Sequence, residues 1–328
     1  MAGLSAGGVD FGAIIERIQV REVKKRILLA SPRGFCLGVD RGVKILESAI
    51  NNEKGVVYVR KEIVHNVPLI NYFKARGAVF VKEVDEIPNG CAVVFSTHGV
   101  APSAREKAAA RNLKVIDATC PLVTKIHEEA VKFKNHGYAI VLIGIPNHPE
   151  IIGTYMQAPD NTHVIQDEND FGKLDGIDGS RVAWLSQTTL DADVTKRIAG
   201  RLREKFPALK DPPRDCICRA TKERQAAVKA IAGECDLFVA VGSEKSSNTR
   251  RLAEIARKSG AKRVVRVDTP EELDGMDFSF VNTIGITSGA SVEEKQVRGV
   301  VSRLAGVGFN RAEERVLGEI TATADGEI

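Results

Sequence analysis

The sequence predicts an α/β protein built from three similar units, each with a mostly parallel sheet. Short apolar runs recur along the 328 residues, and segments with apolar residues at three- and four-residue spacing lie between them. This alternation of strand and helix patterns is typical of parallel sheets. Polar segments that carry a cysteine follow strands at Cys36, Cys120 and Cys218, roughly a hundred residues apart. The repeat favours three units over the two that length alone suggests.

The predicted strands are almost continuously apolar, which is typical of a sheet covered on both faces. In chain order they are Arg26–Ala30, Val56–Val59, Ala92–Phe95, Lys114–Ile116, Ala139–Ile143, Val182–Leu185, Leu237–Val241 and Thr283–Ile286. The predicted helices are Gly38–Ile50, Pro102–Asn112, Leu122–His136, Asp191–Phe206, Ala220–Gly233 and Asn248–Lys258, with a further helix that begins near 292–294.

These elements divide the chain into three α/β domains between two terminal segments. We expect an N-terminal extension over residues 1–25, domains over 26–119, 120–214 and 215–316, and a polar C-terminal tail over 317–328. The first strand of the first domain is a candidate to pack with the third domain.

Composition and charge exclude several classes of protein. Apolar residues make up 43% and charged residues 27%, which is ordinary for a globular protein. A net charge of +4 is too small to indicate a nucleic-acid binder, although it is compatible with an anionic small substrate. No segment has the roughly 18 apolar residues of a membrane helix, and the first residues resemble neither a secretory signal nor a transit peptide. We therefore expect a cytoplasmic protein that binds neither nucleic acid nor membrane.

The six cysteines fall into two groups. In a protein without a secretion signal they are not expected to form a disulfide framework. Cys91 and Cys235 stand at the start of apolar strands and are interpreted as packing residues. Cys36, Cys120 and Cys218 each stand at a strand-to-helix junction, where backbone amides and the helix dipole favour a thiolate. These three thiolates form an incomplete tetrahedral ligand set.

Two metal centres are compatible with three cysteines. One is zinc with a histidine or water as fourth ligand, and the other is a [4Fe–4S] cluster in which one iron has no protein ligand. The spacing alone does not decide between them. The cysteines lack the close pairs of a structural zinc site, since Cys216 and Cys218 form C-x-C rather than C-x-x-C.

A second group of polar residues also follows the strands. His65, His98 and His148 lie on loops after strands, and three such histidines in equivalent places suggest a common anion site. Ser246 and Ser247 precede a predicted helix, where one of them is expected to cap the helix N-terminus. Such a terminus also binds phosphate, and Ser288–Ser291 precedes another helix. Together these sites could hold a diphosphate.

Glu150 follows His148 on the predicted turn Asn147–Glu150. A carboxyl group enclosed beside an anion has a raised pKa and can donate a proton. Gly34–Gly38 does not match the G-x-G-x-x-G pattern of dinucleotide-binding loops, so a nicotinamide cofactor is not indicated.

Nine ordered motifs between residues 27 and 305 resemble the 4-hydroxy-3-methylbut-2-enyl diphosphate reductase family, also called LytB. The motifs are Pro32–Cys36, Glu62–Asn66, His98–Val100, Asp117–Pro121, His148–Glu150, Gln187–Leu190, Arg224–Gln225, Gly242–Ser243 with Ser246–Asn248, and Gly289–Ser291. So many motifs in order over this length are very specific.

The resemblance implies a trefoil of three α/β domains around a central iron–sulfur cluster. It implies one [4Fe–4S] cluster per chain, held by three cysteines: Cys36, Cys120 and Cys218. It implies that the substrate diphosphate is bound by His65, His98, Ser246, Ser247, Asn248 and Ser291. His148 and Thr188 would line the substrate and take part in catalysis, and Glu150 would be the proton donor.

The reaction implied is the last step of the non-mevalonate isoprenoid pathway. The allylic hydroxyl of the substrate is removed reductively, which gives isopentenyl and dimethylallyl diphosphates and water. The electrons would come from a ferredoxin or flavodoxin-type donor, and a modest positive charge suits an acidic donor. We expect a monomer or a weak homodimer.

The sequence departs from the family pattern at a few positions, none of them a proposed ligand. Asn147 and Met156 stand where glycine is usual, and Lys222–Glu223 stands where Thr-Asn is common. Cys216 is an additional thiol close to Cys218.

Two alternatives remain beside the reductase. A zinc-dependent hydrolase of a phosphorylated small molecule would use the same residues without electrons, and its lack of colour would distinguish it. A non-catalytic anion-binding or sensing protein would consume no electrons when substrate is added.

Overall fold

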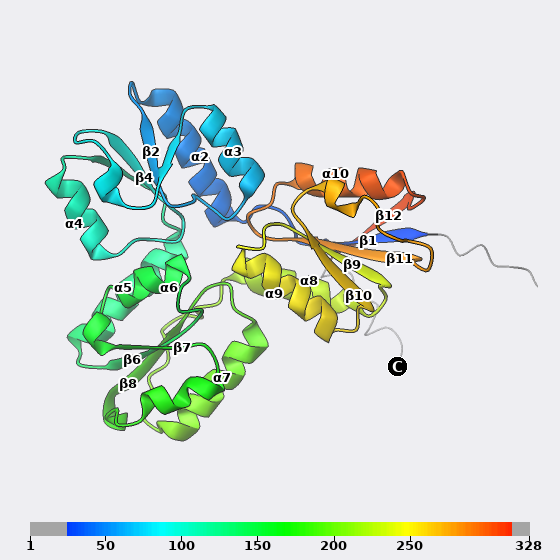
Figure 1. Cartoon of the computed structure of the whole chain (residues 1–328). Coiled ribbons are helices and arrows are strands. Elements are labelled where there is room, and N and C mark those ends of the chain that lie inside the picture. Colours follow the sequence, from blue (N-terminus) through cyan, green and yellow to red (C-terminus); the bar gives the residue numbers. More distant parts are fainter. Residues whose placement is uncertain (1–24, 317–328) are drawn as a thin grey trace, which may run out of the picture.

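The computed structural model describes residues 25–316, which fold into a trefoil of three α/β units (Figure 1). Each unit has its own small parallel sheet: β3-β2-β4-β5 in the first, β7-β6-β8 in the second and β10-β9-β11-β1-β12 in the third. The predicted fold class is therefore confirmed. The proposed N-terminal extension, except Lys25, and the C-terminal tail lie outside the described residues.

The first unit is the blue and cyan lobe of Figure 1. Its apolar strands pair in parallel, with Val94 of β4 opposite Val59 of β2 and Ile116 of β5. Its strands are β2 (Val57–Arg60), β3 (Val79–Val81), β4 (Ala92–Phe95) and β5 (Lys114–Asp117). Its helices are α2 (Leu37–Asn52), α3 (Val67–Ala75) and α4 (Pro102–Ala110), with the short 3-10 turn η1 (Val84–Glu86).

The second unit is the green lobe, in which β6 is the central strand of the sheet. Its strands are β6 (Ala139–Ile143), β7 (Thr162–Ile165) and β8 (Val182–Ser186). Its helices are α5 (Pro121–Asn135), α6 (Pro149–Tyr155) and α7 (Ala192–Lys205), and its 3-10 turns are η2 (Pro159–Asn161), η3 (Glu168–Leu174) and η4 (Gly179–Arg181).

The third unit contains strands from both ends of the described chain. Its strands are β1 (Arg26–Ser31), β9 (Leu237–Val241), β10 (Arg263–Val267), β11 (Thr283–Ser288) and β12 (Arg311–Val316). Its helices are α8 (Arg219–Ala232), α9 (Ser247–Lys258) and α10 (Glu294–Ala305), with the 3-10 turn η5 (Pro270–Leu273). The central strands β9 and β11 are buried along their whole length.

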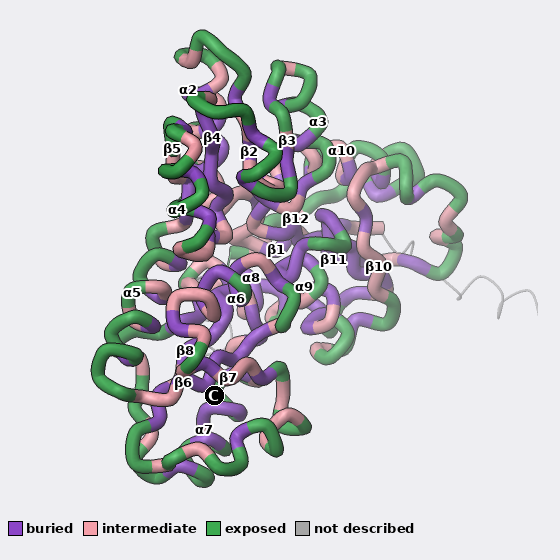
Figure 2. The backbone as a smooth tube through the Cα atoms, turned by 60° about the vertical axis from the view of Figure 1, so that its left-hand side comes forward, coloured by how far each residue is buried: buried purple, intermediate pink, exposed green. Residues whose placement is uncertain are grey.

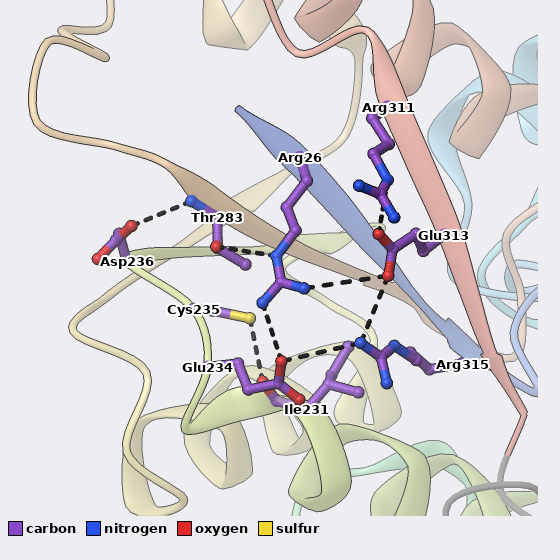
Figure 3. Close-up of polar contacts among 9 residues, drawn as sticks. All are labelled: Arg26, Ile231, Glu234, Cys235, Asp236, Thr283, Arg311, Glu313 and Arg315. Atoms are coloured by element: carbon purple, nitrogen blue, oxygen red, sulfur yellow. Dashed lines mark hydrogen bonds and ion pairs between the residues drawn. The ribbon is translucent and has the colours of Figure 1, made fainter. Parts of the chain in front are cut away.

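Strand β1 joins the third sheet although the rest of that unit follows much later in the sequence. It pairs in parallel with β11 on one side and β12 on the other. Figure 3 shows the charged network at this seam: Arg26 of β1 lies 3.0 Å from Glu234 and 4.0 Å from Glu313, and Arg315 of β12 contacts both carboxylates. The side chains are about a quarter to a half exposed, so each ion pair adds little stability.

The sequence patterns miss four strands, and all of them lie at sheet edges. They are β3, β7, β10 and β12. An edge strand carries charged or polar residues and is short, as in the three residues of β3 and the Arg-Ala-Glu-Glu-Arg-Val sequence of β12. Their apolar runs are therefore too weak to stand out in the sequence.

One predicted turn is a helix. The sequence predicts a turn at Asn147–Glu150, but His148 is the N-cap of α6 and Glu150 lies in its first turn. Pro149 occupies the first helical position, where its missing N–H costs nothing and its fixed φ suits the helix.

Burial follows the layers of the fold. In Figure 2 the buried residues follow the strands and the inner sides of the helices, while the exposed residues follow the outer loops. Within residues 25–316, no helix is long and apolar enough to cross a membrane.

Candidate active site

A single cavity lies where the three units meet, and it contains every site residue that the sequence predicts. The cavity and its open mouth together hold about 730 Å³ of space, part of which is solvent. The predicted residues that line it are Cys36, His65, His98, Cys120, His148, Glu150, Thr188, Cys218, Ser246, Ser247, Asn248 and Ser291. They come from loops at the carboxyl ends of the parallel strands, where such sheets place their ligands.

The three predicted cysteine ligands all begin helices. Cys36, Cys120 and Cys218 are the N-cap residues of α2, α5 and α8. The Cys36 sulfur accepts the Val39 N–H at 3.4 Å, and the Cys218 sulfur accepts the Thr221 N–H at 3.2 Å. Each thiol therefore stands at the positive end of a helix, which favours a thiolate that binds metal.

Burial acts against ionisation of these thiols when no cation is bound. It raises the pKa of Cys120 and of Cys218. Metal binding requires thiolates, so loading the site would release protons. Cys91 and Cys235 pack in apolar clusters away from the cavity, as predicted. Cys216 is buried in the core of the second unit and does not line the cavity.

A buried arginine completes the surroundings of the thiols. Arg224 is only 3% exposed, and it donates to the carbonyls of Gly34 at 2.6 Å and Ala220 at 2.9 Å. Its Nε has no hydrogen-bond partner in the described residues. Burial lowers the pKa of Arg224, while negative charge on Cys36 and Cys218 would raise it. Thiolates at these positions would therefore balance a buried cation.

The donor set fits a cluster better than a single metal ion. Among residues 25–316, no three His, Cys, Asp or Glu side chains are grouped closely enough to hold one ion. Cys36, Cys120 and Cys218 nevertheless share one cavity. Cysteines that each bind a different iron of a cluster lie further apart than the ligands of a single ion.

Three imidazoles form one wall of the cavity. The ring centroid of His65 lies 4.6 Å from that of His98 and 5.9 Å from that of His148. Burial lowers the pKa of His98 well below its usual value and that of His148 to about 3, and the charge of His65 lowers both further. His148 accepts the Glu150 N–H through Nδ1 at 3.2 Å. A neutral His148 therefore carries its proton on Nε2.

The carboxyl group of Glu150 is buried, and both of its hydrogen-bond donors belong to Thr188. It is 3% exposed, and Thr188 donates to it twice, from the backbone N–H at 2.7 Å and from the hydroxyl at 3.0 Å. Burial raises the pKa of Glu150 to about 7, even though both Thr188 hydrogen bonds lower it. The group is therefore poised to gain or lose a proton near neutral pH.

The serines and the asparagine of the third unit form another wall. Ser246 is the N-cap of α9, as expected, and its hydroxyl accepts the Thr249 N–H at 3.2 Å. Ser247 contacts Gln187 and Thr189 of the second unit. Both amide atoms of Asn248 are buried and have no partner among the described residues. A polar group of this kind beside a helix N-terminus is suited to a phosphate ligand.

Among the motif residues for which the sequence predicts no role, three make contacts that support the site. Glu62 contacts His65, Arg224 contacts the loop before Cys36, and Gln187 connects the second and third units. In the sequence, a role for these residues is indicated by their place in motifs whose other members are predicted to bind the metal or the substrate. Their partners are distant in sequence or depend on the loop conformation, so the sequence could not identify them.

Comparisons with known proteins agree with this geometry. The LytB protein family matches residues 27–305. A "4-hydroxy-3-methylbut-2-enyl diphosphate reductase" of Mycolicibacterium vanbaalenii is 51% identical over 87% of this chain and 85% of its own. A "4-hydroxy-3-methylbut-2-enyl diphosphate reductase 1" of Mycobacterium bovis is 50% identical over 92% of each chain.

Solved structures agree as well. The E-1-hydroxy-2-methyl-but-2-enyl-4-diphosphate reductase from Plasmodium falciparum superposes with a TM-score of 0.85 at 34% identity, over 92% of this chain and 98% of its own. A second structure, of an (E)-4-hydroxy-3-methyl-but-2-enyl diphosphate reductase, has a TM-score of 0.62 at 34% identity, over 86% and 99% of the two chains. With the family match over most of its length, this chain belongs to the LytB family of 4-hydroxy-3-methylbut-2-enyl diphosphate reductases.

Proposed function

We propose that the protein reduces (E)-4-hydroxy-3-methylbut-2-enyl diphosphate to isopentenyl and dimethylallyl diphosphates, the terminal step of the non-mevalonate pathway. The allylic C–O bond breaks and a C–H bond forms, two electrons and two protons are consumed, and the oxygen leaves as water. One observation carries the proposal: three cysteines from three units, a buried carboxyl group, and histidine, serine and asparagine side chains suited to an anion share one cavity.

Cys36, Cys120 and Cys218 would hold one [4Fe–4S] cluster per chain. Their convergence, and the buried Arg224 beside two of them, support an anionic cluster here. When bound, such a cluster supplies the electrons and an iron without a protein ligand that can act as a Lewis acid.

The substrate diphosphate would lie between the histidine and serine walls. His65 and His98 come from the first unit, and Ser246, Ser247, Asn248 and Ser291 from the third. The first backbone amides of α9 and the free amide of Asn248 are donors suited to phosphate oxygens. Because the two walls belong to different units, bound diphosphate would hold those units together.

Glu150 would be the proton donor, with Thr188 and His148 as its partners in catalysis. The Thr188 hydroxyl contacts the carboxyl group and Thr188 lines the cavity, so it can relay a proton. His148 presents Nε2–H and can orient the substrate without carrying a charge. Because the buried walls would exclude water, the proton of Glu150 would pass to the substrate rather than to solvent.

The electrons would come from a small acidic carrier of the ferredoxin or flavodoxin type. Leu37, the neighbour of Cys36, is 90% exposed. Leu122 lines both the cavity and an outer groove that carries Lys125 and Arg214. The groove also carries the acidic residues Glu128, Glu129 and Asp215, of which Glu129 and Asp215 are paired with Lys132 and Lys222. An acidic protein docked here would approach the cysteines closely.

The zinc-dependent hydrolase is not supported. The described residues contain no group of three ligands for a single ion, and the relatives named above are reductases. The cytoplasmic location and the monomer or weak homodimer remain predictions.

The test is iron and acid-labile sulfide analysis with a visible spectrum, on protein purified without oxygen. We expect about four irons per chain and a broad band near roughly 400 nm. Cys218→Ser should lose the band, while Cys91→Ser, a matched control in the core of the first unit, should keep it. Reduction of the allylic diphosphate with dithionite should follow. A colourless protein with stoichiometric zinc after anaerobic reconstitution would refute the proposal.

A further inference from the structure

Glu62 lies between two units and touches a residue of each. One carboxylate oxygen is 2.8 Å from Nδ1 of His65, and the other is 3.0 Å from Nζ of Lys245 in the third unit. The hydrogen bond from His65, followed by that from Lys245, lowers the pKa of Glu62 to about 2, although burial opposes this. Glu62 is therefore a carboxylate at any physiological pH.

This contact determines which nitrogen of His65 carries a proton. A carboxylate is only an acceptor, so Nδ1 must carry the proton that it donates to Glu62. Nε2 is then the nitrogen left for the cavity, and in a neutral ring it offers only a lone pair. Phosphate oxygens are acceptors too. His65 can therefore donate to a diphosphate through Nε2 only as an imidazolium cation.

The other two histidines are in a different state. His148 accepts through Nδ1, so its neutral ring already presents Nε2–H. Among the described residues, only His65 of the three imidazoles has a carboxylate partner. Of the other charged or titratable groups near these rings, Lys61 faces His98, Arg250 faces His148, and Lys245 lies beyond Glu62. Glu150 lies beside His148, and burial raises its pKa to about 7, but its carboxyl group is held by Thr188 rather than by an imidazole. Glu62 is the group that can balance a charge on His65.

The same segment is attached to the third unit on its other side. Asn66 donates to the Ser291 carbonyl at 2.6 Å, and the Ser291 hydroxyl donates to the His65 carbonyl at 3.2 Å. The His65 loop is thus fixed to the third unit at both ends. This places the ring where the substrate diphosphate would contact both units.

We propose that Glu62 is a positioning residue that holds His65 as the imidazolium that binds the substrate diphosphate, while its ion pair with Lys245 joins the first and third units around that anion. The inference rests on the proposed function, because it takes the anion to be a diphosphate. It predicts that binding takes up a proton on the protein and weakens as pH rises, by at most about tenfold per pH unit for one proton.

The experiment is calorimetric titration of the cluster-loaded protein with inorganic diphosphate between pH 6 and 8.5. Two buffers of different ionisation enthalpy give the number of protons taken up. The buried Glu150 can also take up a proton, so every variant is made in a Glu150→Gln background. Diphosphate itself titrates too, so its contribution is cancelled by comparing variants with the same ligand. In this background we expect proton uptake at neutral pH with Glu62 present.

Two variants separate charge from structure. In Glu62→Gln the amide oxygen still accepts from Nδ1, so the ring orientation stays but the charge is lost. We expect about tenfold weaker binding at pH 7.5, loss of the proton uptake, and recovery at low pH. Lys245→Met breaks the ion pair between the units but leaves the Glu62 charge, so proton uptake should persist. Glu53→Gln, which removes a similar carboxylate from an ion pair with Lys114, should behave as the background does.

The outcomes are distinct. Equal losses in Glu62→Gln and Lys245→Met at every pH would mean that the contact is only structural and would overturn the proposal. Absence of proton uptake with Glu62 present would overturn it too, whether or not the Glu62→Gln variant folds. Failure of the wild-type protein to bind inorganic diphosphate would instead count against the anion site of the proposed function.

Discussion

At the residue scale, the most informative group is the buried carboxyl of Glu150. Most buried carboxylates are paired with a cation, but the partners of Glu150 are the amide and hydroxyl of Thr188. Burial disfavours the charged form and raises the pKa of Glu150 to about 7. A neutral acid at physiological pH can donate a proton, which a paired surface carboxylate could not.

Replacing Glu150 tests this role. Glu150→Gln keeps one of the two oxygens that accept from Thr188 but has no acidic proton to give, so turnover should fall about 10²-fold or more while substrate binding persists. In the wild-type protein kcat/KM should fall as pH rises through about 7, because Glu150 loses its proton there. The measurement is kcat/KM against pH with dithionite as reductant. Normal turnover by Glu150→Gln would refute the assignment.

At the element scale, the site depends on how closely three helix N-termini approach one another. Gly38 in the first turn of α2 allows this approach, because a Cβ there would lie 2.8 Å from the Cys120 sulfur and 3.9 Å from that of Cys36. Helix α2 therefore packs against the start of α5 without any side chain at position 38 between the two cysteines. Arg224 adds a second connection, from α8 to the loop before Cys36.

Gly38→Ala should therefore impair metal binding. We expect iron affinity to fall about 10-fold, because the methyl group displaces the Cys120 sulfur. Gly200→Ala is the matched control, since Gly200 lies inside α7 with nothing near the position of its Cβ. That change should raise the free energy of unfolding by about 0.5–1 kcal/mol through helix propensity. The measurements are iron content and denaturant unfolding, and full iron loading of Gly38→Ala would contradict the packing argument.

At the scale of the whole molecule, the inner cavity and an outer groove meet at Leu122, two positions after Cys120. The histidine, serine and glutamate walls surround the inner cavity, while Leu37 and the groove with Lys125 and Arg214 face solvent. In the function proposed above, the substrate would bind in the cavity and the electron donor would dock at the outer groove.

This arrangement predicts a donor-specific defect. Lys125→Glu combined with Arg214→Glu should raise KM for a reduced acidic ferredoxin about tenfold at low salt, with a smaller effect at high salt because of screening. Activity with dithionite should not change. Lys196→Glu on α7, an exposed residue of the second unit, is the control for general charge effects. Equal losses with both reductants would exclude the groove as a docking surface.

Much of the fold was accessible from the sequence. The central strands such as β9 and β11 are continuously apolar, and their burial on both faces is the direct cause of that pattern. The cysteines at strand-to-helix junctions were recognisable as helix starts, because capping depends on local backbone geometry. The edge strands β10 and β12 were not predicted, since they contain charged residues that are exposed to solvent and interrupt the apolar pattern.

Local periodicity and motifs were enough to predict the α/β class, the three repeated units and the residue types that face the cavity. The packing of the three units was needed to show that β1 lies within the third sheet, that Glu150 is enclosed in the first turn of a helix, and that Glu62 joins His65 to Lys245. These features depend on contacts between residues far apart in the chain. Burial and the resulting pKa shifts are properties of the packed units, so no local pattern encodes them.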